Sequence, residues 1–121
     1  MEFTSQICTT KEQSERLLAL GLKKETADCF LEYVGRDNYG NNVWHPSIIV
    51  NNYRMPDYSR DFPAWSLHRL LCLIPKEYRY DIDASQFFVD AMICSDPYTE
   101  TIELIRLLLE DGYIYDEYLN V

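Results

Sequence analysis

The sequence has few histidines and none of the common nucleotide or metal motifs, and these absences exclude several classes of function. Its two histidines, His45 and His68, belong to no HExxH motif and to no Cys/His spacing of a zinc site. No G-x-G-x-x-G, P-loop or G-x-S-x-G motif occurs, which argues against nucleotide cofactors and the common serine hydrolases. Asp81 and Asp83 form a D-x-D pair that lacks the other ligands of a calcium loop. We therefore expect no metal and no cofactor.

Long apolar runs and export signals are also absent. No stretch reaches the roughly 20 apolar residues of a membrane span, and the first residues, MEFTSQICTTKEQ, lack the basic and apolar regions of a signal peptide. The four cysteines, Cys8, Cys29, Cys72 and Cys94, are scattered without CxxC spacing. Buried thiols in a reducing compartment explain them better than a disulfide framework, although four cysteines alone leave both open. We expect a soluble, cytoplasmic protein that binds no membrane.

Positive charge is scarce near the C-terminus. The net charge is −9, and residues 1–80 hold ten acidic and ten basic side chains, whereas residues 81–121 hold ten acidic side chains against Arg106 alone. Such a field repels nucleic acid and attracts a basic protein, so we expect no nucleic-acid partner. The alternative is a solvated acidic face that only aids solubility. The candidate partner-binding residues are Asp111, Asp116 and Glu117.

The length and composition fit a single globular domain over residues 1–121. The chain is 47% hydrophobic and 14% aromatic, which is too apolar for a disordered protein. The predicted elements follow the order α-β-β-α-β-β-α. We therefore predict an α+β fold in which about three helices pack on a small antiparallel or mixed sheet.

Three segments carry start and stop signals of helices. The first helix is predicted over residues 10–20, where Thr9 and Glu12 can form a capping box and Gly21 suits the left-handed position that ends a helix.

The other two helices have equally clear boundaries. The second is predicted over residues 67–74, with Ser66 as the N-cap and Pro75 as the stop. The third lies in DPYTETIELIRLLLEDG, where Asp96 caps the first turn and Gly112 ends the helix.

Extended segments are predicted on both sides of the second helix. Residues 29–34 are compatible with a strand, and the segment around Pro46 is predicted to lie at a sheet edge, because proline cannot donate a ladder hydrogen bond. Residues 78–82 and 86–94 are predicted to pair as a hairpin at the centre of the sheet. Residues 51–65 show no clear period and are predicted to form a long surface loop.

Trp65 has two possible roles. If Ser66 caps the second helix, Trp65 and Leu70 occupy the two positions of a hydrophobic staple, which is a structural role. In the other interpretation, aromatic residues of the long loop form one wall of a ligand pocket against the sheet. The candidate pocket residues are Trp44, Tyr53, Tyr58 and Trp65.

One imidazole stands near a cysteine on a predicted helix. His68 precedes Cys72 by four residues, so the two side chains can meet on the helix surface. The leucines around Cys72 favour a buried, inert thiol over a nucleophile. We therefore predict no catalytic residues.

Three blocks of the sequence, TTKEQSERLLALGL, PAWSLHRLLCLIPK and DPYTETIELIRLLLEDGYI, resemble small uncharacterised proteins encoded in phages and mobile elements of gut bacteria. In that group an EQS-containing helix ending in LGL precedes a PAWSL or PCWSL helix and a leucine-rich closing helix with GYI. The resemblance covers about half of the chain and leaves residues 35–61 unmatched. The group has no established activity, so the resemblance implies an accessory bacterial or phage context and assigns no catalytic residues.

We expect a small non-enzymatic interaction protein whose acidic C-terminal third faces a basic partner. A sharper form of this hypothesis is an inhibitor or immunity protein whose carboxylates mimic phosphate in a basic enzyme cleft. Ten tyrosines and the leucine-rich helices leave a homodimer open, because tyrosine is enriched at interfaces. The competing hypothesis is a small-molecule-binding domain or minor enzyme with a pocket near Trp44 and Trp65.

Overall fold

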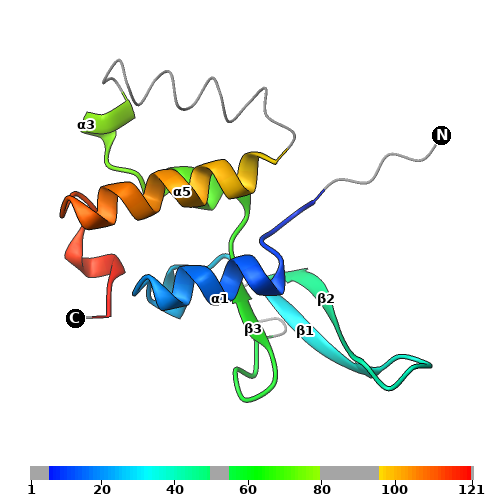
Figure 1. Ribbon diagram of the computed structural model, residues 1–121. Helices are drawn as coiled ribbons and strands as arrows, with labels where there is room; N and C mark the ends of the chain where they lie inside the picture. The colour runs from blue at the N-terminus through cyan, green and yellow to red at the C-terminus, as the bar shows by residue number, and fades with distance from the viewer. Residues whose placement is uncertain (1–5, 50–54, 80–95, 121) are drawn as a thin grey trace.

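Helices and strands occupy separate parts of the fold, as expected of an α+β protein. The structure is a computed structural model that describes residues 6–49, 55–79 and 96–120. In this part of the chain a three-stranded antiparallel sheet lies beside a group of helices, which confirms the predicted fold class (Figure 1). The helical elements are α1 (Lys11–Ala19), η1 (Lys24–Thr26), α2 (Leu67–Cys72), α3 (Lys76–Arg79), α5 (Pro97–Glu110) and η2 (Asp116–Tyr118), and the strands are β1 (Cys29–Arg36), β2 (Asn42–Ile48) and β3 (Phe62–Ala64).

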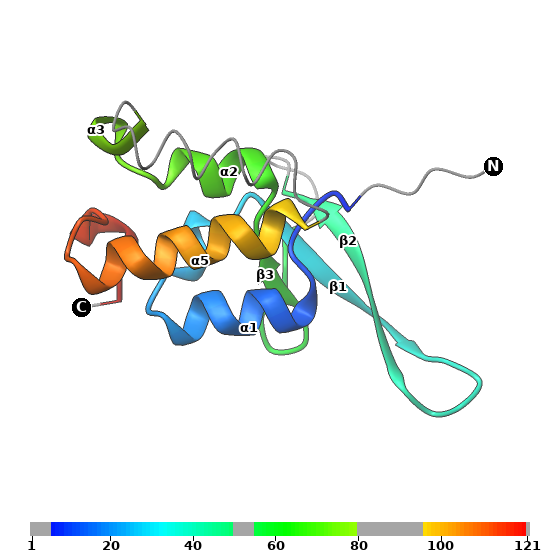
Figure 2. The same cartoon turned by 45° about the horizontal axis from the view of Figure 1, so that its top comes forward.

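The sheet has the order β2-β1-β3, with β1 antiparallel to both neighbours. The prediction that the segment around Pro46 forms an edge strand is confirmed, because β2 pairs with β1 alone among the described strands. The pairing of β1 with β2 shifts register between Tyr33 and Gly35, and Gly35 has a φ of +113° at this bulge. Beyond it the hairpin projects away from the helices (Figures 1 and 2).

The prediction of an unbroken loop over residues 51–65 was wrong, because β3 lies inside that range. β3 pairs with Cys29, Phe30 and Leu31 of β1. It has only three residues and contains Pro63, so it lacks the alternation from which a strand is recognised in sequence. Residues 51–54 lie outside the described part of the chain.

The predicted strand over residues 78–82 was wrong at its start. Tyr78 lies in α3, whose first turn follows Pro75, and the Tyr78 N–H donates to the Pro75 carbonyl at 3.0 Å. A proline before this turn supplies helical φ without needing a hydrogen bond of its own, and this outweighs the strand preference of tyrosine. The remainder of that strand and the predicted strand over residues 86–94 lie outside the described residues. Among the described strands, β1 occupies the centre of the sheet.

Helix α1 begins one residue later than predicted, at Lys11. Thr10 is the N-cap, its hydroxyl accepts from the Gln13 N–H, and the Gln13 side chain completes the capping box. The predicted pair of Thr9 and Glu12 was therefore wrong by one position. Thr9 is held outside the helix because its N–H donates to the Trp65 carbonyl at 2.8 Å. The predicted stop is confirmed, since Gly21 follows the helix with a φ of +104°.

The caps of the other two predicted helices are confirmed. The Ser66 hydroxyl accepts from the Arg69 N–H at the start of α2, and α2 ends at Cys72, two residues before the predicted end. The Asp96 carboxylate accepts from the Thr99 N–H at the start of α5. In Figure 2, α5 lies between α1 and α2, so its apolar side chains meet both neighbouring helices.

The Trp65 side chain is fully buried, with 0% of its surface exposed, and lies in the same apolar cluster as Leu70. Its Nε1–H donates to the Thr26 hydroxyl at 2.9 Å, and its backbone N–H donates to the Thr9 hydroxyl at 3.1 Å. Trp65 therefore joins the residues before α1, the η1 turn and the start of α2. The structural interpretation of Trp65 is confirmed, and its assignment to an open pocket was wrong.

We expect Trp65→Phe to lower the free energy of unfolding by about 1–3 kcal/mol. The substitution removes the indole N–H that pairs with Thr26 and leaves unfilled space in the core. Denaturant unfolding of the purified protein measures the change. Trp44→Phe is the matched control. The Trp44 indole also donates a hydrogen bond, to the Arg60 carbonyl, but its side chain is only half-buried. Equal losses in the two variants would contradict the central role of Trp65.

Glu103 gives α5 an electrostatic link to α1. It pairs with Arg106 on its own helix and with Arg16 of α1, whose Nη2 lies 2.5 Å from Glu103 Oε2. The hydrogen bond from Arg106, and then that from Arg16, hold the pKa of Glu103 below its usual range. The folded-state pKa is therefore depressed, and the stabilisation is present at neutral pH and is lost as the pH falls through that lowered value.

We accordingly expect Glu103→Gln to lower the melting temperature at pH 7. We expect the difference in melting temperature between this variant and the native protein to shrink as the pH falls below the usual pKa of a carboxyl group. Thermal unfolding followed at a series of pH values measures this. Glu25→Gln, which removes the same charge at an exposed position, is the control. A difference that stays constant down to strongly acidic pH would show that Glu103 acts through packing instead.

Candidate functional site

A groove lies between α3 and the turn that follows α5, with a volume of about 420 Å³. We call it the tyrosine groove. Three tyrosines and two carboxylates stand among its lining residues, and α3 and residues 112–116 supply its two sides. These five residues are Glu77, Tyr78, Tyr113, Tyr115 and Asp116.

The backbone reversal after α5 brings the two sides of the tyrosine groove together. Gly112 has a φ of +75°, and the Tyr113 N–H donates to the Leu108 carbonyl at 2.9 Å, which ends the helix and turns the chain back. The rings of Tyr78 and Tyr113 then meet with centroids 4.5 Å apart. Ile114, the next residue, is buried in the apolar core.

The C-terminal residues are attached to the rest of the fold by backbone hydrogen bonds. The Lys23 N–H donates to the Tyr118 carbonyl, and the Asn120 N–H donates to the Gly21 carbonyl, each at 2.8 Å. Leu22 forms an isolated antiparallel bridge with Leu119. The turn carrying the acidic residues is therefore held against the end of α1.

Negative charge surrounds Tyr115 in the tyrosine groove. Its hydroxyl lies 3.5 Å from Glu77 Oε2, and the charge of Glu77, with further contributions from burial and from Glu117, raises the pKa of Tyr115. A raised phenol pKa means that the local field disfavours another negative charge, and the same field favours a cation. Lys76 directly precedes Glu77 on α3, but it is not among the residues that line the tyrosine groove.

The three predicted partner-binding residues lie on this same turn. Asp111 caps the C-terminal end of α5, and Asp116 and Glu117 belong to η2, and all three are exposed. Asp116 also lines the tyrosine groove. Glu77 and Tyr78 were not predicted as site residues, because Tyr78 was assigned to a strand and Glu77 to no element. The neighbouring Pro75 was the signal for a helical turn there.

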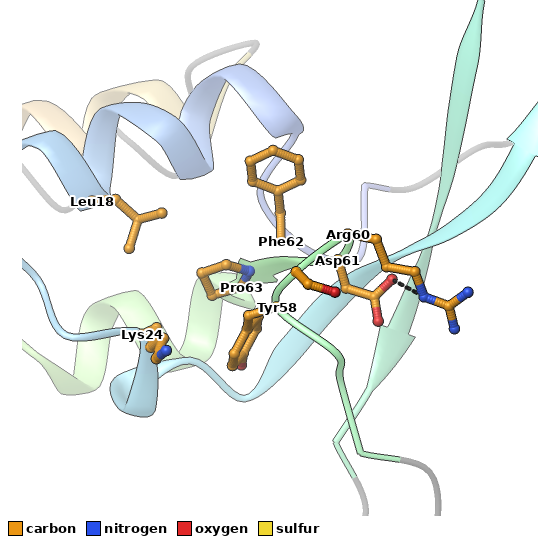
Figure 3. A pocket seen from close by; sticks show the side chains of 8 residues that line it. Leu18, Lys24, Tyr58, Arg60, Asp61, Phe62 and Pro63 are labelled. Atoms are coloured by element: carbon orange, nitrogen blue, oxygen red, sulfur yellow. Dashed lines mark ion pairs between the residues drawn. The ribbon is translucent and has the colours of Figure 1, made fainter.

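A second cavity, of about 270 Å³, opens beside the loop before β3 (Figure 3). Tyr58, Phe62 and Pro63 form its apolar side, and the Lys24 ammonium lies 5.2 Å from the centre of the Tyr58 ring. Arg60 also lines it and pairs with Asp61, as the dashed line in Figure 3 marks.

The four predicted pocket residues are not gathered at this cavity. Tyr58 lines it. Trp44 lies on the sheet, where its ring packs against those of Tyr33 and Phe62 at centroid distances of 5.5 and 5.6 Å. Trp65 fills the core, and Tyr53 is outside the described residues. A common pocket formed by Trp44, Tyr58 and Trp65 was therefore a wrong prediction, because Trp65 faces inward from the opposite end of β3.

Asp61 organises the loop that borders the second cavity. Its carboxylate is buried and accepts from the Tyr33 N–H at 2.8 Å and from the Asp57 N–H at 2.9 Å. Arg60 Nε lies 3.9 Å from the same carboxylate. Two backbone donors and a guanidinium compensate this buried charge, so Asp61 has a structural role.

Helix α2 presents a thiol and an imidazole to solvent. Cys72 Sγ lies 3.5 Å from His68 Nε2, so the predicted contact across one helical turn exists. The prediction that Cys72 is buried was wrong: it is exposed, because α2 buries Leu70 against the core and Cys72 points away from it. Adjacent leucines in the sequence did not indicate which face of this short helix is covered.

Across residues 6–49, 55–79 and 96–120, no three His, Cys, Asp or Glu side chains come together as metal ligands. No helix in those ranges is long and apolar enough to cross a membrane. Comparisons of the chain with protein-family models, with curated proteins and with solved structures found no match.

We expect Asp61→Asn to lower the free energy of unfolding by about 1–3 kcal/mol. The amide keeps one acceptor oxygen and presents an N–H₂ group to the second backbone donor, which leaves a buried N–H without a partner. Denaturant unfolding measures the loss. Asp57→Asn is the control, because Asp57 accepts from Ser59 at an exposed position. If the two variants lost equal stability, the loop would not depend on the buried carboxylate.

Proposed function

We propose that this protein is a small interaction protein that binds a basic segment of a partner protein through its acidic C-terminal third. The observation that carries this proposal is the tyrosine groove, where aromatic rings and carboxylates line one concave surface. We further propose that it acts in the cytoplasm of a bacterium or a phage-infected cell, as the three resembling sequence blocks suggest.

The chemistry of the tyrosine groove suits lysine or arginine side chains. Tyrosine rings attract a cation at their faces, and carboxylates beside the rings add charge-assisted hydrogen bonds. Tyr113 and Tyr115 are 47% and 46% exposed, so their ring surfaces are available to a partner. Asp111 and Glu117 extend the negative surface beyond the groove and would steer a basic partner towards it.

The test uses a short arginine- and lysine-rich peptide, with binding followed by calorimetry at low and high salt. We expect the triple variant Asp111→Asn, Asp116→Asn and Glu117→Gln to weaken binding and to reduce its salt dependence. The matched control removes three exposed carboxylates from the other part of the chain, Glu12→Gln, Glu15→Gln and Glu25→Gln, with the same change in net charge.

A tyrosine variant separates the groove from general charge attraction. We expect Tyr115→Ala to weaken peptide binding by about two- to five-fold, the loss of one exposed cation–π contact. Tyr39→Ala is the control, because Tyr39 is exposed at the tip of the β1–β2 hairpin. If both triple variants weaken binding equally and Tyr115→Ala has no effect, the acidic face only supports solubility.

The second candidate is a binding site for a small anionic molecule in the cavity beside Tyr58. The observation that favours it is the Lys24 ammonium beside the Tyr58 ring, next to an apolar wall. A ligand in this cavity would be lost with Tyr58→Ala and would be retained in the triple variant of Asp111, Asp116 and Glu117. The two candidates therefore differ in which variant abolishes binding.

A further inference from the structure

Two cysteines far apart in sequence come together at the start of the central strand, β1. Cys8 belongs to the segment before α1 and Cys29 is the first residue of β1, and both lie in one apolar cluster with Leu31 and Ala64. Their exposed fractions are 4% and 3%. Both are free thiols.

The backbone holds the Cys8 segment in place beside the strands. Thr9, the next residue, donates its N–H to the Trp65 carbonyl and accepts the Trp65 N–H at its hydroxyl. The Gln6 side chain donates to the Cys8 carbonyl at 2.9 Å. Cys29 is fixed by its pairing with Ala64 of β3. Backbone hydrogen bonds of the folded protein therefore hold both cysteines in position.

The two thiols are chemically unequal. The Cys29 S–H donates a hydrogen bond to the Cys8 sulfur, which lowers the pKa of Cys8 and, with burial, raises the pKa of Cys29. Cys8 is thus the thiol that ionises first, and Cys29 retains its proton. The thiolate is the nucleophilic form of cysteine, so Cys8 is the candidate attacking group and Cys29 the candidate resolving group.

A small cavity leads to Cys8 and not to Cys29. It has a volume of about 300 Å³ and is mostly apolar, with Ile7, Leu31 and Pro46 among its lining residues beside Cys8. A small neutral molecule can enter such a space, whereas the charged active site of a protein oxidoreductase cannot reach a thiol that is 4% exposed. The burial of Cys8 and the size of this cavity therefore favour a small molecule as the oxidant.

We propose that Cys8 and Cys29 form a dithiol site that reduces a small peroxide and closes to an intramolecular disulfide. The Cys8 thiolate attacks one peroxide oxygen, the O–O bond breaks, and Cys8 becomes a sulfenic acid while hydroxide leaves and takes up the proton that Cys8 released. The Cys29 sulfur then attacks the sulfenic sulfur, so that the S–S bond forms as the S–O bond breaks, and the departing hydroxide takes up the Cys29 proton to give a second water. Two thiols and one peroxide thus give one disulfide and two waters.

The closed disulfide would attach the segment before α1 to the central strand, because Cys8 and Cys29 lie in one buried cluster. Cross-linking two distant residues restricts the unfolded chain and raises the stability of the folded protein. The site is separate from the tyrosine groove, and the proposal does not depend on partner binding. Cys72, exposed beside His68, has a different environment and serves as the internal comparison.

The test uses full-length protein with Cys72→Ser and Cys94→Ser, which leaves only the proposed pair, treated with hydrogen peroxide under native conditions. We expect the intact mass to fall by two hydrogens, peptide mapping to show Cys8 joined to Cys29, and the melting temperature to rise until a dithiol reductant reverses the change. Adding Cys29→Ser should leave Cys8 as a sulfenic acid, trapped by dimedone.

Circular dichroism establishes whether each variant is folded before oxidation. If a serine variant does not fold, differential alkylation of the unsubstituted protein before and after peroxide gives the same information, with Cys8 and Cys29 losing reactivity together. The proposal is overturned if the folded protein keeps both thiols free under peroxide, if only Cys72 is oxidised, or if Cys8 is converted to a sulfinic acid without closing on Cys29.

Discussion

The rest of the structure depends on the burial of Trp65 between three separate segments. Its indole N–H reaches Thr26 of η1, its backbone exchanges hydrogen bonds with Thr9, and its ring shares the core with the helices. Directly after it, the Ser66 hydroxyl and N–H both bond to the Asp28 carboxylate, which ties the start of α2 to the residue before β1. A buried indole N–H without a hydrogen-bond partner is costly, so the hydrogen bond to Thr26 favours the one arrangement of these segments in which it can form.

This arrangement places the two proposed sites apart. Thr9 is fixed to Trp65, so Cys8 reaches Cys29 beside the sheet. At the other end, α5 packs between α1 and α2, and its reversal at Gly112 brings Tyr113 against Tyr78. The projecting hairpin and the tyrosine groove therefore lie at opposite ends of the described fold (Figures 1 and 2). The tyrosine groove and the small cavity beside Cys8 share no lining residue.

Local signals in the sequence predicted most helix boundaries because capping is a short-range interaction. Ser66, Asp96 and Gly21 act where they were expected, since each needs only its near neighbours along the chain. Thr9 failed as a cap for a long-range reason, the hydrogen bond to Trp65. Cys72 likewise failed as a buried residue, because the face that a short helix buries is decided by what packs on it.

The sequence by itself determined the α+β class, the edge position of the strand containing Pro46, the caps of α2 and α5 and the concentration of negative charge after residue 80, because these follow from local preferences and composition. The tertiary structure decided which distant residues meet: β3 with β1, Tyr78 with Tyr113, and Cys8 with Cys29. No local pattern encodes such contacts. They arise when Trp65 and the apolar faces of the helices are buried together, and the candidate sites consist of the residues that this burial brings side by side.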